Sequence, residues 1–192
     1  RVKFELGLFN NPNRDKNREA NFYQKEHLEA AKQAAIKSTV LLKNESILPL
    51  KPTTKIALIG PLAEAPHDQL GTWAFDGDQD HTVTVLDAFK NSSSNFRYVQ
   101  GLTYSRDQSN KQFKKAVAAA RNSDVIVFVA GEEAILSGEA HCRSQTHLPG
   151  AQETLIKELA KTGKPIILVI MAGRPITLTN ILSDINAVLM TW

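Results

Sequence analysis

The sequence has one cysteine, no long apolar run and no large excess of charge of one sign, and each shortage removes a class of protein. Cys142 is the only cysteine among 192 residues, so the chain forms no internal disulfide and no zinc site from several thiolates. No apolar run approaches the roughly 18 residues of a membrane-spanning helix, and we expect no membrane partner. The 23 basic residues nearly balance the 20 acidic ones and are scattered, so we expect no nucleic-acid partner.

The two ends also lack features of a complete protein. No signal peptide opens the chain, which starts at Arg1 without Met and stops at Trp192 directly after an apolar run. We therefore expect a piece of a larger protein, truncated at its C-terminal end. Residues 1–21 contain the turn formers and charges of Asn10–Asp15 and indicate a linker, whereas residues 22–192 indicate one domain.

The spacing of apolar residues predicts an α/β fold. A helical period predicts a first helix over Phe22–Lys43. After Pro52, short apolar runs alternate with helical segments. The expected strands are Ile56–Ile59, Phe96–Val99, Val125–Val129, Ile166–Ile170 and Ala187–Met190, and the expected helices are Val83–Lys90, Asn110–Arg121 and Ala151–Lys161. Continuous apolar strands are typical of parallel sheets buried on both faces, so we expect an open, mostly parallel sheet between helices, a flavodoxin-like α/β sandwich.

Ligands of such sheets bind beyond the carboxyl ends of the strands. Pro61–His81, Gly131–Pro149 and Gly173–Pro175 fall at that edge, and the first two exceed the usual length of about 2–6 residues. The first loop contains the candidate substrate contacts Trp73, Phe75 and Asp76, because aromatic rings stack on sugars and carboxylates bind their hydroxyls. The alternative is that Trp73 pins its own loop to the core.

The second loop concentrates the reactive side chains. It contains three glutamates, a histidine, a cysteine and an arginine within Gly131–Ser144. Glu139 follows a glycine, which lets its carboxylate project into a cleft as a general acid. The alternative is a solvated loop in which Glu139 forms an ion pair with Arg143. Adjacent His141 and Cys142 give only weak support to a cysteine hydrolase.

Other ligand chemistries find little support. Gly60-Pro61-Leu62-Ala63 lacks both the glycine fingerprint and the lysine of nucleotide sites. The five histidines show no paired spacing with carboxylates, so we expect no catalytic metal and no cofactor.

Several stretches together resemble family 3 glycoside hydrolases, especially bacterial β-glucosidases, over nearly the whole chain. Phe4–Pro12 is similar to the segment that leaves the N-terminal (β/α) barrel of that family. Further similar stretches, in order, are Ser38–Glu45, Leu48-Pro49-Leu50, Ile56–Ala63, Gly71-Thr72-Trp73, Gly163-Lys164-Pro165 and Gly173-Arg174-Pro175. The resemblance implies that residues 1–21 link a preceding barrel to this α/β domain.

The resemblance also implies a retaining hydrolysis of β-glucosides. An aspartate of the barrel attacks the anomeric carbon, and a glutamate of the second domain protonates the leaving oxygen and later deprotonates water. Glu139 matches the acid/base glutamate of the family, with Glu132 as runner-up, and Glu132 and Arg143 are further candidate substrate contacts. Glu132 suits either substrate binding or structure.

The sequence is compatible with three functions. The first is part of an exo-acting β-glucosidase, inactive alone because the nucleophile lies on the barrel, with a β-glucoside oligosaccharide as substrate. β-Xylosidase specificity is an alternative within this class. The others are a non-catalytic carbohydrate-binding or scaffold module and, from architecture alone, a small-ligand domain. The resemblance implies a periplasmic or secreted protein.

Overall fold

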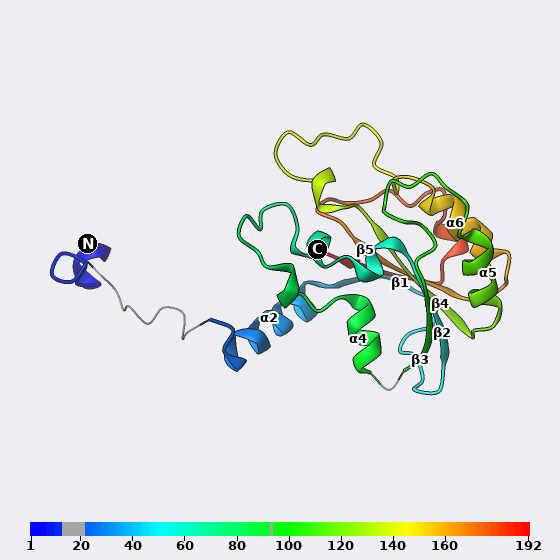
Figure 1. The fold of residues 1–192 in the computed structure, drawn as a ribbon, viewed down its shortest axis with the longest axis horizontal. Coiled ribbons are helices and arrows are strands. Elements are labelled where there is room, and N and C mark those ends of the chain that lie inside the picture. The colour runs from blue at the N-terminus through cyan, green and yellow to red at the C-terminus, as the bar shows by residue number, and fades with distance from the viewer. Residues whose placement is uncertain (13–21, 93) are drawn as a thin grey trace. The chain divides into compact units, whose positions relative to one another are not determined.

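The computed structural model describes residues 1–12, 22–92 and 94–192, which divide into two compact units. Arg1–Lys37 contains the short helix α1 (Val2–Glu5) and the helix α2 (Lys25–Ser38), which runs one residue further. Ser38–Trp192 contains the sheet and the other helices (Figure 1). Residues 13–21, the second part of the expected linker, lie outside the described residues.

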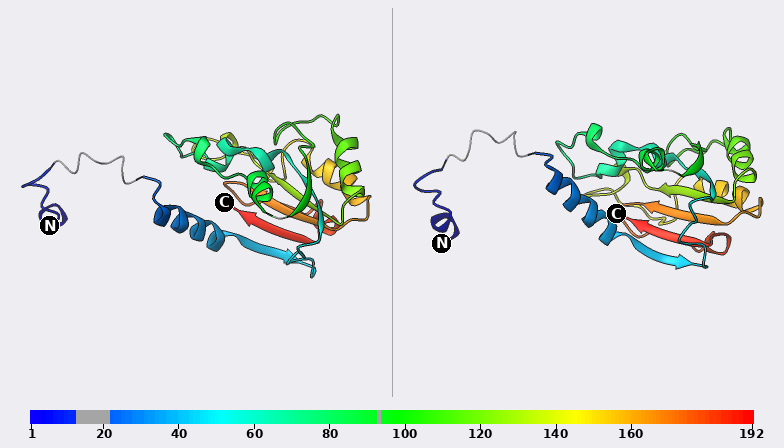
Figure 2. Two further views of the ribbon diagram at one scale, coloured as in Figure 1. Left: turned by 60° about the horizontal axis from the view of Figure 1, so that its bottom comes forward. Right: turned by 90° about the horizontal axis from the view of Figure 1, so that it is seen from below.

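The second unit is built on a six-stranded sheet. Its strands are β1 (Val40–Asn44), β2 (Lys55–Ile59), β3 (Asn95–Val99), β4 (Val125–Gly131), β5 (Ile166–Met171) and β6 (Ala187–Thr191), in the spatial order β1-β6-β5-β4-β2-β3. All neighbours are parallel except β1, which runs opposite to β6 at one edge (Figure 2). The expected open, mostly parallel sheet is therefore confirmed.

The helices of this unit cover both faces of the sheet. They are α3 (Pro66–Leu70), α4 (Val85–Asn91), α5 (Phe113–Arg121) and α6 (Gln152–Ala160), with 3₁₀ turns at Pro61–Glu64, Gln79–His81, Ala134–Leu136 and Leu182–Asp184. The side chains of α5 and α6 pack with Ile59, Ile126 and Phe128. Those of α4 and the first 3₁₀ turn pack on the opposite face. Strand β4 is buried along its whole length, as its unbroken apolar sequence predicts.

One predicted element is wrong at its end. The helix expected over Phe22–Lys43 is α2, which ends at Ser38, and Val40–Asn44 is a strand. The helical spacing of Thr39 and Leu42 was outweighed by backbone pairing with β6, in which Val40 lies opposite Met190 and Leu41 opposite Leu189. That partner is distant in sequence, so local periodicity could not reveal it.

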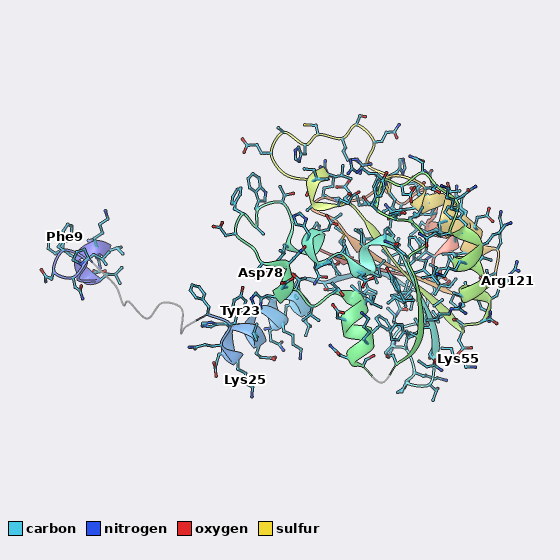
Figure 3. The ribbon with its side chains drawn as sticks, viewed as in Figure 1. Phe9, Tyr23, Lys25, Lys55, Asp78 and Arg121 are labelled. Atoms are coloured by element: carbon cyan, nitrogen blue, oxygen red, sulfur yellow. The ribbon has the colours of Figure 1, made fainter. Side chains whose placement is uncertain are left out.

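The strand order places the candidate loops. The five parallel strands, taken in chain order, have the flavodoxin-like order 2-1-3-4-5, whose switch point lies between β2 and β4. The loops after β2 and β4 are those singled out from the sequence. Figure 3 shows Lys55, the first residue of β2, at the opposite end of the sheet. No described helix is long and apolar enough to cross a membrane.

Phe128→Ala should lower the free energy of unfolding by about 3–5 kcal/mol, because it leaves a cavity around a fully buried side chain. Phe75→Ala is the matched control: its ring is 84% exposed, so we expect a change within about 0.5 kcal/mol. Urea denaturation of the chain measures both. Equal losses would contradict the assignment of Phe128 to the core.

Candidate active site

The loop after β4 starts from a buried carboxylate. Gly131, with φ 138°, lets the backbone of β4 approach β5 so closely that a Cβ would lie 1.8 Å from the carbonyl oxygen of Met171. The amide of Glu132 donates to that same carbonyl oxygen at 2.9 Å. The Glu132 side chain is completely buried, and two arginines of the chain occupy its carboxylate oxygens.

Those two arginines reach the carboxylate from different segments. Arg174, just beyond β5, donates from Nε to Glu132 Oε2 at 3.0 Å, and Arg143 donates from Nη1 to Oε1. Each guanidinium also binds the backbone of the loop: Arg174 Nη2 donates to the carbonyl oxygens of Leu136 and, at 2.8 Å, His141. Arg143 Nη2 donates to the carbonyl oxygen of His147 at 3.1 Å. The loop is therefore folded around one buried negative charge.

The loop after β2 is tied to the same structure. Thr72 Oγ1 lies 2.8 Å from the carbonyl oxygen of Ser137 and also within bonding distance of that of Ala134. Asp68 accepts a hydrogen bond from the amide of Ala134 at 2.9 Å. Gly138 has φ 103°, and a Cβ there would lie 2.5 Å from Thr72 Cγ2. The residue before Trp73 therefore contacts the residue before Glu139.

Glu139 lies at the exposed end of this loop, between Gly138 and Ala140, both with positive φ. Among the described residues it has no ion-pair or hydrogen-bond partner, so its carboxylate is open to solvent. The alternative of a Glu139 to Arg143 ion pair is wrong, because Arg143 pairs with Glu132. Cys142 is exposed, and His141 Nδ1 lies 3.0 Å from the carbonyl oxygen of Ser137.

The aromatic residues of the first loop are also exposed. Trp73 is 60% exposed and Phe75 84%, and their rings meet edge to face with centroids 6.0 Å apart. Asp76 beside them is exposed as well. The alternative that Trp73 pins its loop to the core is wrong, because its ring is largely exposed and the segment is attached through Thr72 and Asp68 instead.

Sequence reasoning missed the buried polar side chains that hold the loop. Gln152 is fully buried: its Oε1 accepts from the amide of Gly131, and its Nε2 lies near the carbonyl oxygens of Gly131, Ser105 and Pro149. From the sequence, Arg174 was predicted only to lie in Gly173–Pro175, beyond the carboxyl ends of the strands where ligands bind. Its place directly after a buried strand was the available signal, whereas nothing in the sequence marks Gln152.

Glu133 forms a further ion pair at the base of the loop, with Arg106. It accepts from Ser105 Oγ at 2.6 Å and from Arg106 Nε at 3.1 Å. Burial alone would raise the pKa of Glu133, but the hydrogen bonds from Arg106 and Ser105 and the arginine charge outweigh it and hold the pKa below its ordinary value of 4.5.

The comparisons with known proteins define the class. The model of the glycosyl hydrolase family 3 C-terminal domain matches residues 39–192, and the chain belongs to that family. A periplasmic β-glucosidase of Salmonella typhimurium is 34% identical over the whole chain, which covers 29% of that protein. A β-xylosidase of Formosa agariphila is also 34% identical over the whole chain, which covers 28% of it.

Solved structures agree with the sequence relatives. The crystal structure of a β-glucosidase from Listeria innocua in complex with glucose matches the whole chain with a TM-score of 0.91 and 33% identity, and the chain covers 26% of it. The resemblance to family 3 glycoside hydrolases is thereby confirmed. The chain spans less than a third of the length of these relatives.

Because the folded pKa of Glu133 is lowered, its carboxylate stabilises the fold fully above the unfolded pKa, and this contribution is lost as the pH falls through the folded value. Glu133→Gln should therefore lower the free energy of unfolding at pH 7, with the deficit shrinking below about pH 4.5. Denaturation over a pH series measures it. Glu158→Gln, which removes a surface pair with Lys161, is the control and should change little. A deficit independent of pH would contradict the ion-pair argument.

Proposed function

We propose that this chain is the acid/base domain of a retaining, exo-acting β-glucosidase that removes terminal β-linked glucose. In this proposal Glu139 protonates the leaving oxygen while an aspartate of a preceding (β/α) barrel attacks the anomeric carbon. Glu139 then takes a proton from the water that releases glucose. Residues 1–21 link the barrel to this domain.

The observation that carries the proposal is the contrast between the two glutamates. Glu139 is exposed at the turn in the middle of the loop after β4, and the base of this loop is held by buried polar contacts. A general acid must reach a substrate oxygen, and the Glu139 carboxylate is free to do so. The Glu132 carboxylate is buried and occupied by two guanidinium groups. This favours the structural alternative for Glu132 and for Arg143, its partner, over direct contact with the sugar.

The exposed side chains of the loop after β2 suit contact with a sugar ring of the substrate. Trp73 and Phe75 offer apolar surfaces for stacking, and Asp76 offers oxygens for hydroxyl groups. The likeness to the Salmonella and Listeria β-glucosidases supports glucose as the sugar removed. The name of the Salmonella protein supports a periplasmic or secreted location. The Formosa relative favours xylose as the second candidate.

This chain alone should not hydrolyse aryl β-glucosides, because a retaining mechanism needs two carboxylates about 5–5.5 Å apart and the proposal places one of them on the barrel. Release of nitrophenol from nitrophenyl β-glucoside by the purified chain measures this. Activity that Glu139→Gln abolishes would overturn the assignment of the nucleophile to another domain.

In the full-length enzyme, Glu139→Ala should lower kcat/KM for cellobiose by about 10²–10⁴-fold, since glucose leaves poorly without a proton. With dinitrophenyl β-glucoside, kcat/KM should change little, because the leaving group needs no acid. Its kcat should fall because the glycosyl-enzyme accumulates, and azide should restore turnover as β-glucosyl azide.

Glu158→Ala on α6 is the control and should behave as wild type. If Glu132→Ala rather than Glu139→Ala shows the leaving-group dependence and the azide rescue, the acid/base is at the end of β4. If neither does, the loop is structural and the carbohydrate-binding module becomes the better account.

A further inference from the structure

Arg174 contacts the Glu139 loop on both sides of its exposed turn. One hydrogen bond goes to Leu136, before the turn, and one goes to His141, after it. A third goes from Nε to the buried carboxylate of Glu132. Among the hydrogen bonds of the described residues, no other side chain joins Leu136 to His141. The Arg174 guanidinium therefore fixes the separation between Leu136 and His141, the two residues between which Glu139 lies.

The turn between these contacts has a strained backbone. Ala140 has φ 64°, a left-handed conformation that disfavours a residue with a Cβ. Gly138 has φ 103° and packs against Thr72, so a larger residue does not fit there. Such conformations persist only where surrounding groups hold them. Arg174 and Thr72 supply side-chain contacts that hold the turn in its described form, and the His141 ring, with Nδ1 3.0 Å from the carbonyl oxygen of Ser137, lies within it.

We infer that Arg174 is a positioning residue for catalysis: by binding Leu136 and His141 while anchored on Glu132, it fixes the turn from which Glu139 reaches the leaving oxygen. The inference rests on the proposed role of Glu139. Arg174 touches neither Glu139 nor, in this account, the substrate. Lysine retains the positive charge beside Glu132 but lacks the planar fork that binds a carboxylate and two carbonyl groups together.

Arg174→Lys in the full-length enzyme separates positioning from general loss of structure. With Glu139 displaced by about 1 Å, kcat/KM for cellobiose should fall by about 10–100-fold. For dinitrophenyl β-glucoside, kcat/KM should stay within about threefold, because this leaving group needs no acid. A variant that is merely partly unfolded would lose both activities by the same factor. Arg121→Lys, at the end of α5 away from the loop (Figure 3), is the matched control and should retain both.

The double variant tests whether Arg174 acts through Glu139. In the Glu139→Ala background, Arg174→Lys should cause no further loss of kcat/KM with cellobiose beyond about twofold, because the group that it positions is absent. A full additional 10–100-fold loss would overturn the inference.

Hydrogen exchange of the Ser137 and His141 amides, which donate to the carbonyl oxygens of Ala134 and Gly138, gives a readout independent of activity. Exchange in the chain with Arg174→Lys should be at least about tenfold faster than in the wild type, and unchanged in Arg121→Lys. Unchanged exchange in Arg174→Lys would overturn the inference. If Glu139→Ala shows the leaving-group dependence but Arg174→Lys does not, the positioning role fails and the proposed function stands. If Glu139→Ala shows none, the proposed function fails and the positioning role with it.

Discussion

The candidate site depends on one buried charge, the carboxylate of Glu132. A buried carboxylate is stable only when its desolvation is offset by opposite charge and hydrogen bonds, and here Arg143 and Arg174 supply both. Because these arginines follow different strands, satisfying the charge also brings their segments together. Each guanidinium then uses its remaining donors on loop carbonyls. The long loop after β4, which has no hydrophobic core of its own, thereby acquires a defined path. This arrangement requires the charged Glu132 at a buried position where sheet packing alone would favour an apolar residue.

The sheet positions this charge with little freedom. Gly131 allows β4 and β5 to approach each other, so Glu132 starts at the sheet edge in hydrogen-bonding register with Met171. The flavodoxin-like strand order then sets the loop of β4 beside the loop of β2. Exposed Trp73 and exposed Glu139 consequently come from adjacent, mutually attached segments. The fold therefore gathers an aromatic surface and a carboxylate at one edge without requiring either to be buried.

Much of this fold is predictable from the sequence because apolar continuity marks buried parallel strands, and β2, β4, β5 and β6 each coincide with such a run. Strand β3, at the edge of the sheet, instead alternates apolar and polar residues. The C-terminal end of α2 was not predictable in this way, because the conformation of β1, which follows it, depends on pairing with the distant strand β6. Within the site, position along the chain singled out Glu139, Glu132 and Arg143 but could not pair them. The pairing of Arg143 with Glu132 instead of Glu139 follows from burial, which depends on tertiary packing. The buried contacts of Gln152 follow from the same cause.

The pairing of β1 with β6 has a consequence for how the chain is made. Val40 and Leu41 find their sheet partners only at Met190 and Leu189. While the intervening residues are being synthesised, the parallel strands from β2 onward have neighbours on which to assemble, whereas β1 has none. Within this domain β1 emerges before the other strands, carries the exposed apolar residues Val40, Leu41 and Leu42, and can join the sheet only once β6 has been synthesised. The ribosome-bound chain thus passes through a stage with an unpaired apolar strand, which is the stage most open to chaperone capture or to pairing with another nascent copy.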